Sequence, residues 1–184
     1  MATALVYFAG CEVLEQEPQA SLPPESVIVD NAGTQAALIG AYSSLQSANY
    51  WGLRYFTFAG MIADEINHTG TFPSFAQIGN RTILADNVEW NNMYTSIYNG
   101  INRVNNIIAA VPGVDDESLN KDQALGEARF LRAMFYFDLI RWWGGTPNGY
   151  NQPNGVGVSI FTEPTLSSED ADPRPRSTEA EVFQ

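Results

Sequence analysis

Residues 126–147 read GEARFLRAMFYFDLIRWWGGTP, and this stretch decides the fold. Apolar side chains recur there every three or four residues, which is the spacing of one face of an α-helix. Gly144 and Gly145 then end the pattern in the way that helices commonly end. The stripe holds Ala124, Ala128, Leu131, Phe135 and Leu139, and it is broadened by Phe130, Met134 and Tyr136. The sequence therefore predicts a long helix with one buried face over residues 118–143.

The same spacing predicts three more helices upstream, over residues 34–48, 54–66 and 88–111. Asp86 stands where the N-cap of the last of these belongs. The stripes hold Leu38, Tyr42 and Leu45 in the first, Phe58, Met61, Ile62 and Ile66 in the second, and Trp90, Tyr94, Ile97, Ile101, Val104 and Ile108 in the third. Helices with one apolar face bury it against one another, so the four together predict a helical core.

The segments between these helices show neither helical nor strand periodicity. Residues 67–80 and 146–176 are predicted as long loops. The fold is therefore expected to be all-α, and its helix pairs are typical of a tetratricopeptide-like helical repeat, although generic helix pairing explains the pattern equally well. Thr178 to Glu181 starts a capping box for another helix. We therefore expect residues 34–184 to be the N-terminal part of a larger α domain, truncated at the C-terminus.

Composition and charge exclude several functions. The chain has 184 residues, 45% of them hydrophobic, which is enough to bury a core without disulfides or metal ions. Nine Lys and Arg against 21 Asp and Glu give a formal charge of −12, and Lys121 is the only lysine. So acidic a chain repels nucleic acid and anionic membrane surfaces. No stretch approaches the roughly 20 apolar residues of a membrane-spanning helix.

The first residues contain a lipoprotein pattern. Residues 1–10 are apolar, and the letters FAGC place small residues before Cys11, as at the sites where bacterial lipoproteins are cleaved and lipidated. A frayed or strand-forming apolar end also explains this segment, because the first basic residue is Arg54 and the basic start of a signal peptide is missing. Cys11 is the only cysteine, which excludes a disulfide within the chain. Residues 11–33 are acidic and contain prolines, so they are predicted as an extended tether.

Several stretches, taken in order and spacing, carry a family resemblance. They are FAGC at 8–11, GAYSSL at 40–45, ADE at 63–65, WNNMY at 90–94, INRVNNII at 101–108, GEARFLRAMFYFDLIRWWGGTP at 126–147 and RST at 176–178. Together they resemble the SusD/RagB family of outer-membrane glycan-binding lipoproteins over nearly the whole chain.

The resemblance implies a tetratricopeptide-like protein that is attached to the outer membrane only through a lipid on Cys11 and faces the cell exterior. It also implies a protein that captures oligosaccharide or polysaccharide and passes it to a TonB-dependent, SusC-like transporter. Members of the family are normally more than twice this length, so we expect later helices and much of the binding face to lie outside this chain. Residues 1–10 would then be a partial signal segment.

The loop after helix 54–66 holds the residue types that bind sugars. Aromatic rings pack on the apolar faces of sugar rings, and amide or charged groups bind the hydroxyls. In the family an Arg and this loop contribute to glycan binding, so the resemblance implies a site at Arg54, Asn67, His68, Phe72 and Phe75. Arg54 matches the family pattern weakly, and a phenylalanine stands where a tryptophan is expected. Alternatively, both phenylalanines tuck the loop onto the preceding helix.

Motifs for catalysis or metal binding are few. Asp64 and Glu65 are a carboxylate pair of the kind that glycosidases use, but adjacent helical positions point about 100° apart, so a solvated or capping role is favoured. His68 is the only histidine, which excludes a multi-His metal site. Residues 115–117 are three carboxylates that could hold a cation but are more typical of a helix N-terminus. No catalytic residue, metal site or cofactor is predicted.

The sequence thus predicts a non-enzymatic, cell-surface glycan-binding lipoprotein. Two alternatives stay open. One is a helical-repeat adaptor that binds proteins and has no sugar site, and the other is a glycoside hydrolase.

Overall fold

The computed structural model describes residues 24–152, 154–167 and 173–184. Its helices are α1 (Pro24–Val27), α2 (Asn31–Leu45), α3 (Arg54–Ile62), α4 (Pro73–Gly79), α5 (Val88–Ala110), the 3-10 turn η1 (Val111–Gly113), α6 (Lys121–Trp143) and α7 (Glu179–Val182). Strand pairing within the described residues is limited to isolated bridges, such as that between Gly145 and Val156. The predicted all-α fold is confirmed.

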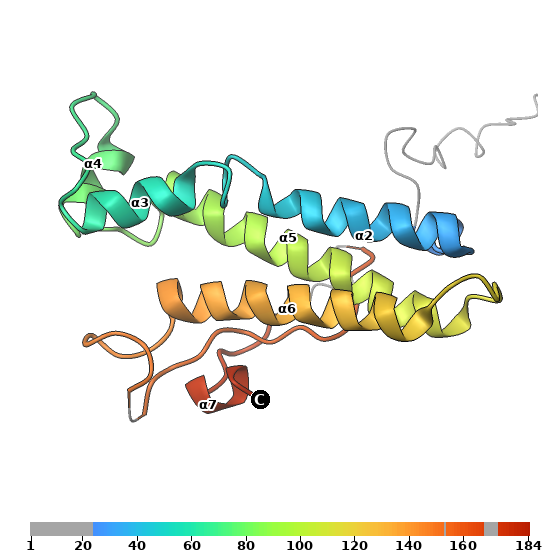
Figure 1. Cartoon of the computed structure of the whole chain (residues 1–184). Coiled ribbons are helices and arrows are strands. Elements are labelled where there is room, and N and C mark those ends of the chain that lie inside the picture. Colours follow the sequence, from blue (N-terminus) through green and yellow to red (C-terminus); the bar gives the residue numbers. More distant parts are fainter. Residues whose placement is uncertain (1–23, 153, 168–172) are drawn as a thin grey trace, which may run out of the picture.

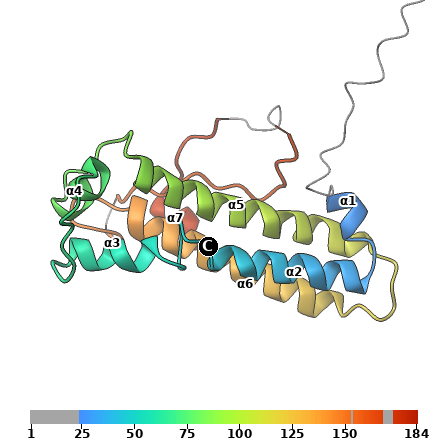
Figure 2. The same cartoon turned by 90° about the horizontal axis from the view of Figure 1, so that it is seen from above.

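The three long helices form the body of the molecule. Helices α2, α5 and α6 each pack on the other two. Figure 1 shows them running lengthwise beside one another, with α3 continuing beyond the end of α2. In the view from above, α5 runs alongside α2, and α6 lies beneath them (Figure 2). The short helix α4 packs on both α3 and α5 at one end, and α7 packs on α6.

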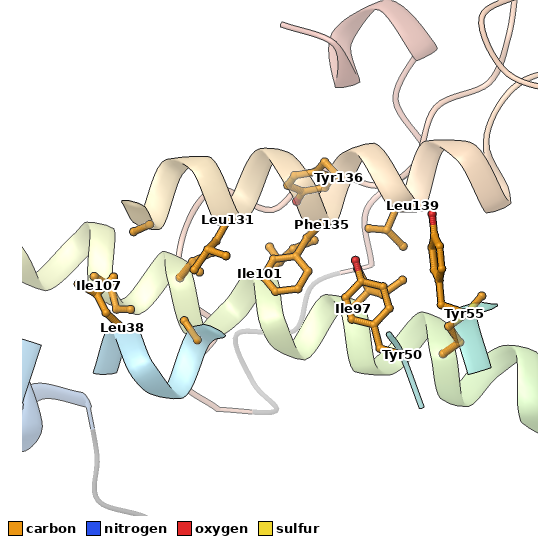
Figure 3. Packing of buried hydrophobic residues seen from close by; sticks show 14 of the residues in the cluster. Leu38, Tyr50, Tyr55, Ile97, Ile101, Ile107, Leu131, Phe135, Tyr136 and Leu139 are labelled. Atoms are coloured by element: carbon orange, nitrogen blue, oxygen red, sulfur yellow. The ribbon is translucent and has the colours of Figure 1, made fainter. Parts of the chain in front are cut away.

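The hydrophobic core lies between these helices (Figure 3). Ile97 and Ile101 of α5 and Phe135 of α6 are fully buried, and burial of one such side chain contributes about 1.5–3 kcal/mol. The predicted stripe of α6 is confirmed, because its five members Ala124, Ala128, Leu131, Phe135 and Leu139 are all buried. Phe130, which was expected to broaden that stripe, is instead 60% exposed.

The buried Asp138 of α6 fixes the turn between α2 and α3. Its carboxylate accepts hydrogen bonds from Trp51 Nε1 (2.8 Å) and from the hydroxyls of Tyr55 (2.9 Å) and Tyr50. Arg141 lies 3.6 Å from the same carboxylate and donates to the Tyr55 hydroxyl (2.8 Å). Figure 3 shows the Tyr50 hydroxyl directed toward α6. Buried charge is tolerated only when it is paired and hydrogen-bonded, and this set of partners meets that need.

In several helices the first residue or the N-cap residue differs from the predicted one. Helix α2 begins at Asn31 rather than Thr34, because Asp30 Oδ1 accepts the Gly33 N–H (2.7 Å). With α1, this places helical residues in the stretch that was expected to be extended. The N-cap of α5 is Asn87, one residue after the predicted Asp86, because its side chain accepts the first free N–H groups of the helix.

Helix α6 begins three residues later than predicted. Its N-cap is Asn120, whose side-chain oxygen accepts the Gln123 N–H (3.1 Å). The start at residue 118 was wrong because Asp116 Oδ1 holds the Ser118 N–H (2.8 Å) and hydroxyl (2.7 Å) in a local turn.

Two predictions around α3 and α4 were wrong. Helix α3 ends at Ile62, not Ile66, because Asp64 adopts a left-handed φ of 62° and the N–H groups of Glu65 and Ile66 return to the Gly60 carbonyl (2.9 and 3.1 Å). The segment 67–80, expected to be a loop throughout, contains α4. Its first helical residue is a proline, which suits that position, and Ile78 is fully buried.

The long segment after α6 is irregular but anchored. The Thr165 N–H donates to Asn102 Oδ1 (2.7 Å), and Asn105 Nδ2 donates to the Phe161 carbonyl (2.9 Å). The predicted capping box is confirmed at Thr178 and Glu181, whose side chains accept each other's backbone N–H groups.

Candidate ligand-binding surfaces

The loop between α3 and α4 lies at one end of the molecule (Figure 1), and its residues His68 and Phe72 form an aromatic cluster with Phe75 of α4. His68 stacks on Phe75, with ring centroids 5.3 Å apart, and Phe72 meets the same ring edge-on at 6.5 Å. Gly70 permits the close packing, because a Cβ there would lie 2.8 Å from His68 Cε1. His68 Nε2 is buried and lacks a hydrogen-bond partner among the described residues. The structure therefore brings three of the predicted site residues together.

The two phenylalanines of this cluster have different environments. Phe75 is half-buried and packs on Phe58 of α3 with ring centroids 6.2 Å apart. Phe72 is 65% exposed. Phe75 thus fastens α4 to the core, whereas most of the Phe72 ring is exposed.

The other two predicted residues do not join the rings. Arg54 begins α3, and its Nε donates to Glu89 Oε2 (2.6 Å), with a further hydrogen bond to Asn49. This ion pair holds α3 to the first turn of α5. Asn67 is exposed beside His68. Arg54 is therefore a positioning group for α3, and Asn67 is an accessible amide at the edge of the cluster.

Two of the candidate catalytic and metal-binding acids, Asp64 and Asp116, have structural partners. Asp64 Oδ2 accepts from Arg81 Nη2 (2.6 Å) at an exposed position. Asp116 accepts the Asn31 N–H at the start of α2 (2.9 Å), and this hydrogen bond, with those from Ser118, holds the pKa of Asp116 below its ordinary value. Within the described ranges, no three His, Cys, Asp or Glu side chains are grouped so as to hold a metal ion.

A second aromatic array runs along α5 and the end of α6. Successive ring centroids lie 4.7 to 5.8 Å apart in the order Trp142, Trp90, Trp143, Tyr94, Tyr98 and Phe161. Trp90 and Tyr94 were expected in the buried stripe of α5, but both are half-buried, and Met93 is buried instead. The spacing of Trp90, Tyr94 and Tyr98 by four residues was a usable signal, because it places three rings on one helix face.

Two cavities border this array. One of about 430 Å³ lies between α5 and the segment 159–165, and Tyr98 and Phe161 line it. The other, of about 510 Å³, is lined in part by Trp143. Tyr94 borders both cavities. Sequence reasoning missed this surface, because segments some 60 residues apart in the chain form it. The Tyr98 hydroxyl, for example, donates a 2.8 Å hydrogen bond to the carbonyl of Ser159, 61 residues further along the chain.

The predicted lipidation site, Cys11, lies outside the described residues. No helix of the described part of the chain is both long enough and apolar enough to cross a membrane.

The chain is similar to known proteins of one family. Residues 12–184 match the SusD-like family, described as starch-binding and associating with the outer membrane. SusD-like protein P2 of Formosa agariphila is 30% identical over 78% of this chain and 29% of its own length. SusD-like protein P38 of the same organism is 30% identical over 95% of this chain and 32% of its own length. The chain thus spans about a third of the length of these relatives.

Solved structures show the same fold. A SusD superfamily protein from Bacteroides fragilis superposes with a TM-score of 0.71 and 23% identity over 85% of this chain and 37% of its own. One from Bacteroides thetaiotaomicron gives a TM-score of 0.66 and 23% identity over 84% of this chain and 34% of its own. The helices therefore adopt the tetratricopeptide-like, all-α fold of that superfamily.

Proposed function

Because the chain belongs to the SusD-like family, we propose that it captures neutral oligosaccharide or polysaccharide at the outer membrane. The family match over residues 12–184 carries this proposal, since the family is described as starch-binding and outer-membrane-associating. The whole protein then passes the glycan to a TonB-dependent, SusC-like transporter. Cys11 carries the lipid that anchors it, and the bound face is directed to the cell exterior.

The aromatic cluster after α3 supports glycan capture. Phe72 offers an exposed ring, 65% accessible, and Asn67 offers an amide beside it. Ring faces pack against the C–H side of a pyranose, and amides bind its hydroxyls. The role proposed for Phe72, Asn67 and His68 is therefore to bind the sugar.

Binding rather than catalysis is favoured by the state of the carboxylates. Asp64 is paired with Arg81, whereas a glycosidase needs two carboxyl groups on either side of one bond. Asp138 is buried under three hydrogen bonds, so it is not available to a substrate. We therefore propose a binding role and assign no reaction to Asp64 or Asp138.

Native electrophoresis through gels that contain soluble starch, xylan or galactomannan tests glycan capture. We expect at least one polysaccharide to retard the chain. Phe72→Ala should weaken this retardation, with a dissociation constant roughly 2- to 12-fold higher, as expected for one aromatic contact of about 0.5–1.5 kcal/mol. Phe130→Ala is the matched control, because Phe130 is similarly exposed, at 60%, but lies on α6. No retardation in any gel, or equal loss in both variants, would contradict the proposal.

Membrane fractionation tests the anchor separately. The chain is expressed behind a complete lipoprotein signal sequence, with Cys11→Ala as the variant and Ser21→Ala as its control. A mature lipoprotein carries several acyl chains, which give stable attachment where one chain does not. We expect Cys11→Ala alone to move the protein to the soluble fraction and to abolish labelling by an alkyne-palmitate. Unchanged fractionation would remove Cys11 from the account.

A further inference from the structure

The cavity of about 430 Å³ between α5 and the segment 159–165 has the size of a small-molecule site. Tyr94, Tyr98 and Phe161 provide aromatic walls, and polar side chains such as Thr95 and Asn99 stand between them. The geometry points to a second carbohydrate-binding pocket here, which takes one neutral pyranose unit of an oligosaccharide. It is separate from the cluster around Phe72.

The walls of the cavity are fixed before any ligand arrives. Two hydrogen bonds join Asn102 and Thr165: the Thr165 N–H donates to Asn102 Oδ1 (2.7 Å), and Asn102 Nδ2 donates to the Thr165 carbonyl (2.9 Å). The Tyr136 hydroxyl donates to the Phe161 carbonyl (3.0 Å) and accepts the Phe161 N–H (2.6 Å). These two hydrogen bonds fix the position of Phe161, which forms the opposite wall of the cavity. A site that is already formed loses less conformational entropy when it binds.

Free polar groups at the rim supply what sugar hydroxyls require. Thr95 and Asn99 are exposed on α5, one turn apart, and neither side chain has a hydrogen bond within the described residues. By contrast, the amide of Asn102 is already occupied. Asn99 therefore has two donors and an acceptor available, beside the ring of Tyr98.

Charge decides between classes of ligand. The described residues that line this cavity include no Asp, Glu, Lys or Arg. Arg174 lies over the Phe161 ring (4.9 Å) and Arg132 Nη1 donates to Asn105 Oδ1, so these two cations are engaged by wall residues rather than directed into the cavity lining. The formal charge of −12 on the whole chain repels an anionic ligand. A purely apolar ligand would leave the Asn99 amide and the Thr95 hydroxyl without partners, at a cost in free energy. A neutral, hydroxyl-bearing ring satisfies both the aromatic walls and the polar rim.

The second cavity extends the first. Tyr94 separates them, and the array continues on its far side through Trp143 and Trp90. A longer oligosaccharide held at the first cavity is thus directed along α5 over further aromatic rings. This continuity favours a sugar within a chain over a free monosaccharide.

Saturation-transfer NMR with maltoheptaose, cellohexaose and mannohexaose tests this pocket on the whole chain. Asn99→Trp fills the mouth of the cavity from an exposed helical position, and Ala109→Trp adds the same ring to α5 outside both cavities. We expect at least one oligosaccharide to bind, with Asn99→Trp lowering affinity at this pocket by roughly tenfold and Ala109→Trp leaving it unchanged.

Combination with Phe72→Ala separates this pocket from the proposed function. In the Phe72→Ala background the pocket should still bind, and adding Asn99→Trp should weaken the remaining binding by a further factor of roughly ten, whereas adding Ala109→Trp should not. Equal behaviour of Asn99→Trp and Ala109→Trp with all three sugars would overturn the pocket, even if Phe72→Ala weakens binding. Loss of binding in Asn99→Trp without an effect of Phe72→Ala would support the pocket and contradict the loop site.

Discussion

At the scale of single residues, Asp138 is the group on which the turn between α2 and α3 depends. Its carboxylate receives hydrogen bonds from the side chains of Tyr50, Trp51 and Tyr55. Removing the acceptor leaves buried donors unpaired, each at a cost of about 1–3 kcal/mol. The three aromatic residues that it holds also begin the ring contacts that lead to Trp142.

We expect Asp138→Ala to lower the free energy of unfolding by about 3 kcal/mol or more. Asp122→Ala, at an exposed position in the first turn of the same helix, should cost at most about 1 kcal/mol through the helix dipole. Urea denaturation followed by circular dichroism measures both. Similar losses in the two variants would show that the buried network does not stabilise the fold.

A second prediction at the scale of residues concerns Tyr55 and the stability of the fold at alkaline pH. Burial, followed by the hydrogen bond to Asp138, raises the pKa of its hydroxyl to about 12, whereas the unfolded value is about 10. The folded state therefore keeps a proton that the unfolded state loses, so stability is complete below pH ~10 and falls as the pH rises toward 12. Tyr55→Phe should reduce the slope of unfolding free energy between pH 10 and 11.5. An unchanged slope in this variant would contradict the assignment.

At the scale of elements, α5 and α6 approach closely where Gly100 faces Phe135. A Cβ at Gly100 would lie 2.6 Å from Phe135 Cζ, and that ring is fully buried. Gly126, on α6, has nothing within 4 Å of a built Cβ. Replacing glycine by alanine should therefore change the free energy of unfolding in opposite directions at these two helical positions.

We predict that Gly100→Ala lowers the free energy of unfolding by about 1–3 kcal/mol, as overpacking of a core does. Gly126→Ala should raise it by about 0.5–1 kcal/mol, because alanine favours the helix. Thermal melts of the two variants beside the parent decide this. Stabilisation by both would mean that α5 and α6 are not in close contact at Gly100.

The attachment of α4 gives another prediction at this scale. Phe75→Ala removes the ring that packs on Phe58, so it should destabilise the protein by roughly 2–3 kcal/mol. Phe72→Ala, at a largely exposed ring, should change stability by no more than about 0.5 kcal/mol. Denaturation midpoints measured in parallel would contradict this division of roles if the two variants lost equal stability.

The elements also show how far sequence reasoning reaches. The stripes of α6 and the capping box at Thr178 were predicted, because they depend on neighbours three or four residues away. Helix α4 was missed, because seven residues are too few for a periodic pattern and its stability comes from burying Ile78 against other elements. The cap of α5 was displaced by one residue, because the adjacent Asp86 and Asn87 are both good capping residues.

At the scale of the whole molecule, the sequence likewise predicted those parts of the candidate sites that depend on near neighbours in the chain and missed those that depend on distant ones. Three of the five predicted ligand-binding residues lie together, since residues 67–75 are close in the chain. Arg54 did not join them, because its long-range partner is Glu89. The array along α5 needed Phe161 and Trp143 to be placed beside Tyr94 and Tyr98, and such tertiary contacts leave no periodic signal in the sequence.

Binding of neutral glycans is the central claim, and a glycan microarray probed with the labelled parent chain, Phe72→Ala and Phe130→Ala tests it most directly. We predict saturable signals for the parent on at least one class of neutral oligosaccharide. Those signals should be weaker for Phe72→Ala and unchanged for Phe130→Ala. An array without signal above background, from a chain whose sharp thermal melt shows that it is folded, would contradict glycan capture and favour a helical-repeat adaptor that binds proteins.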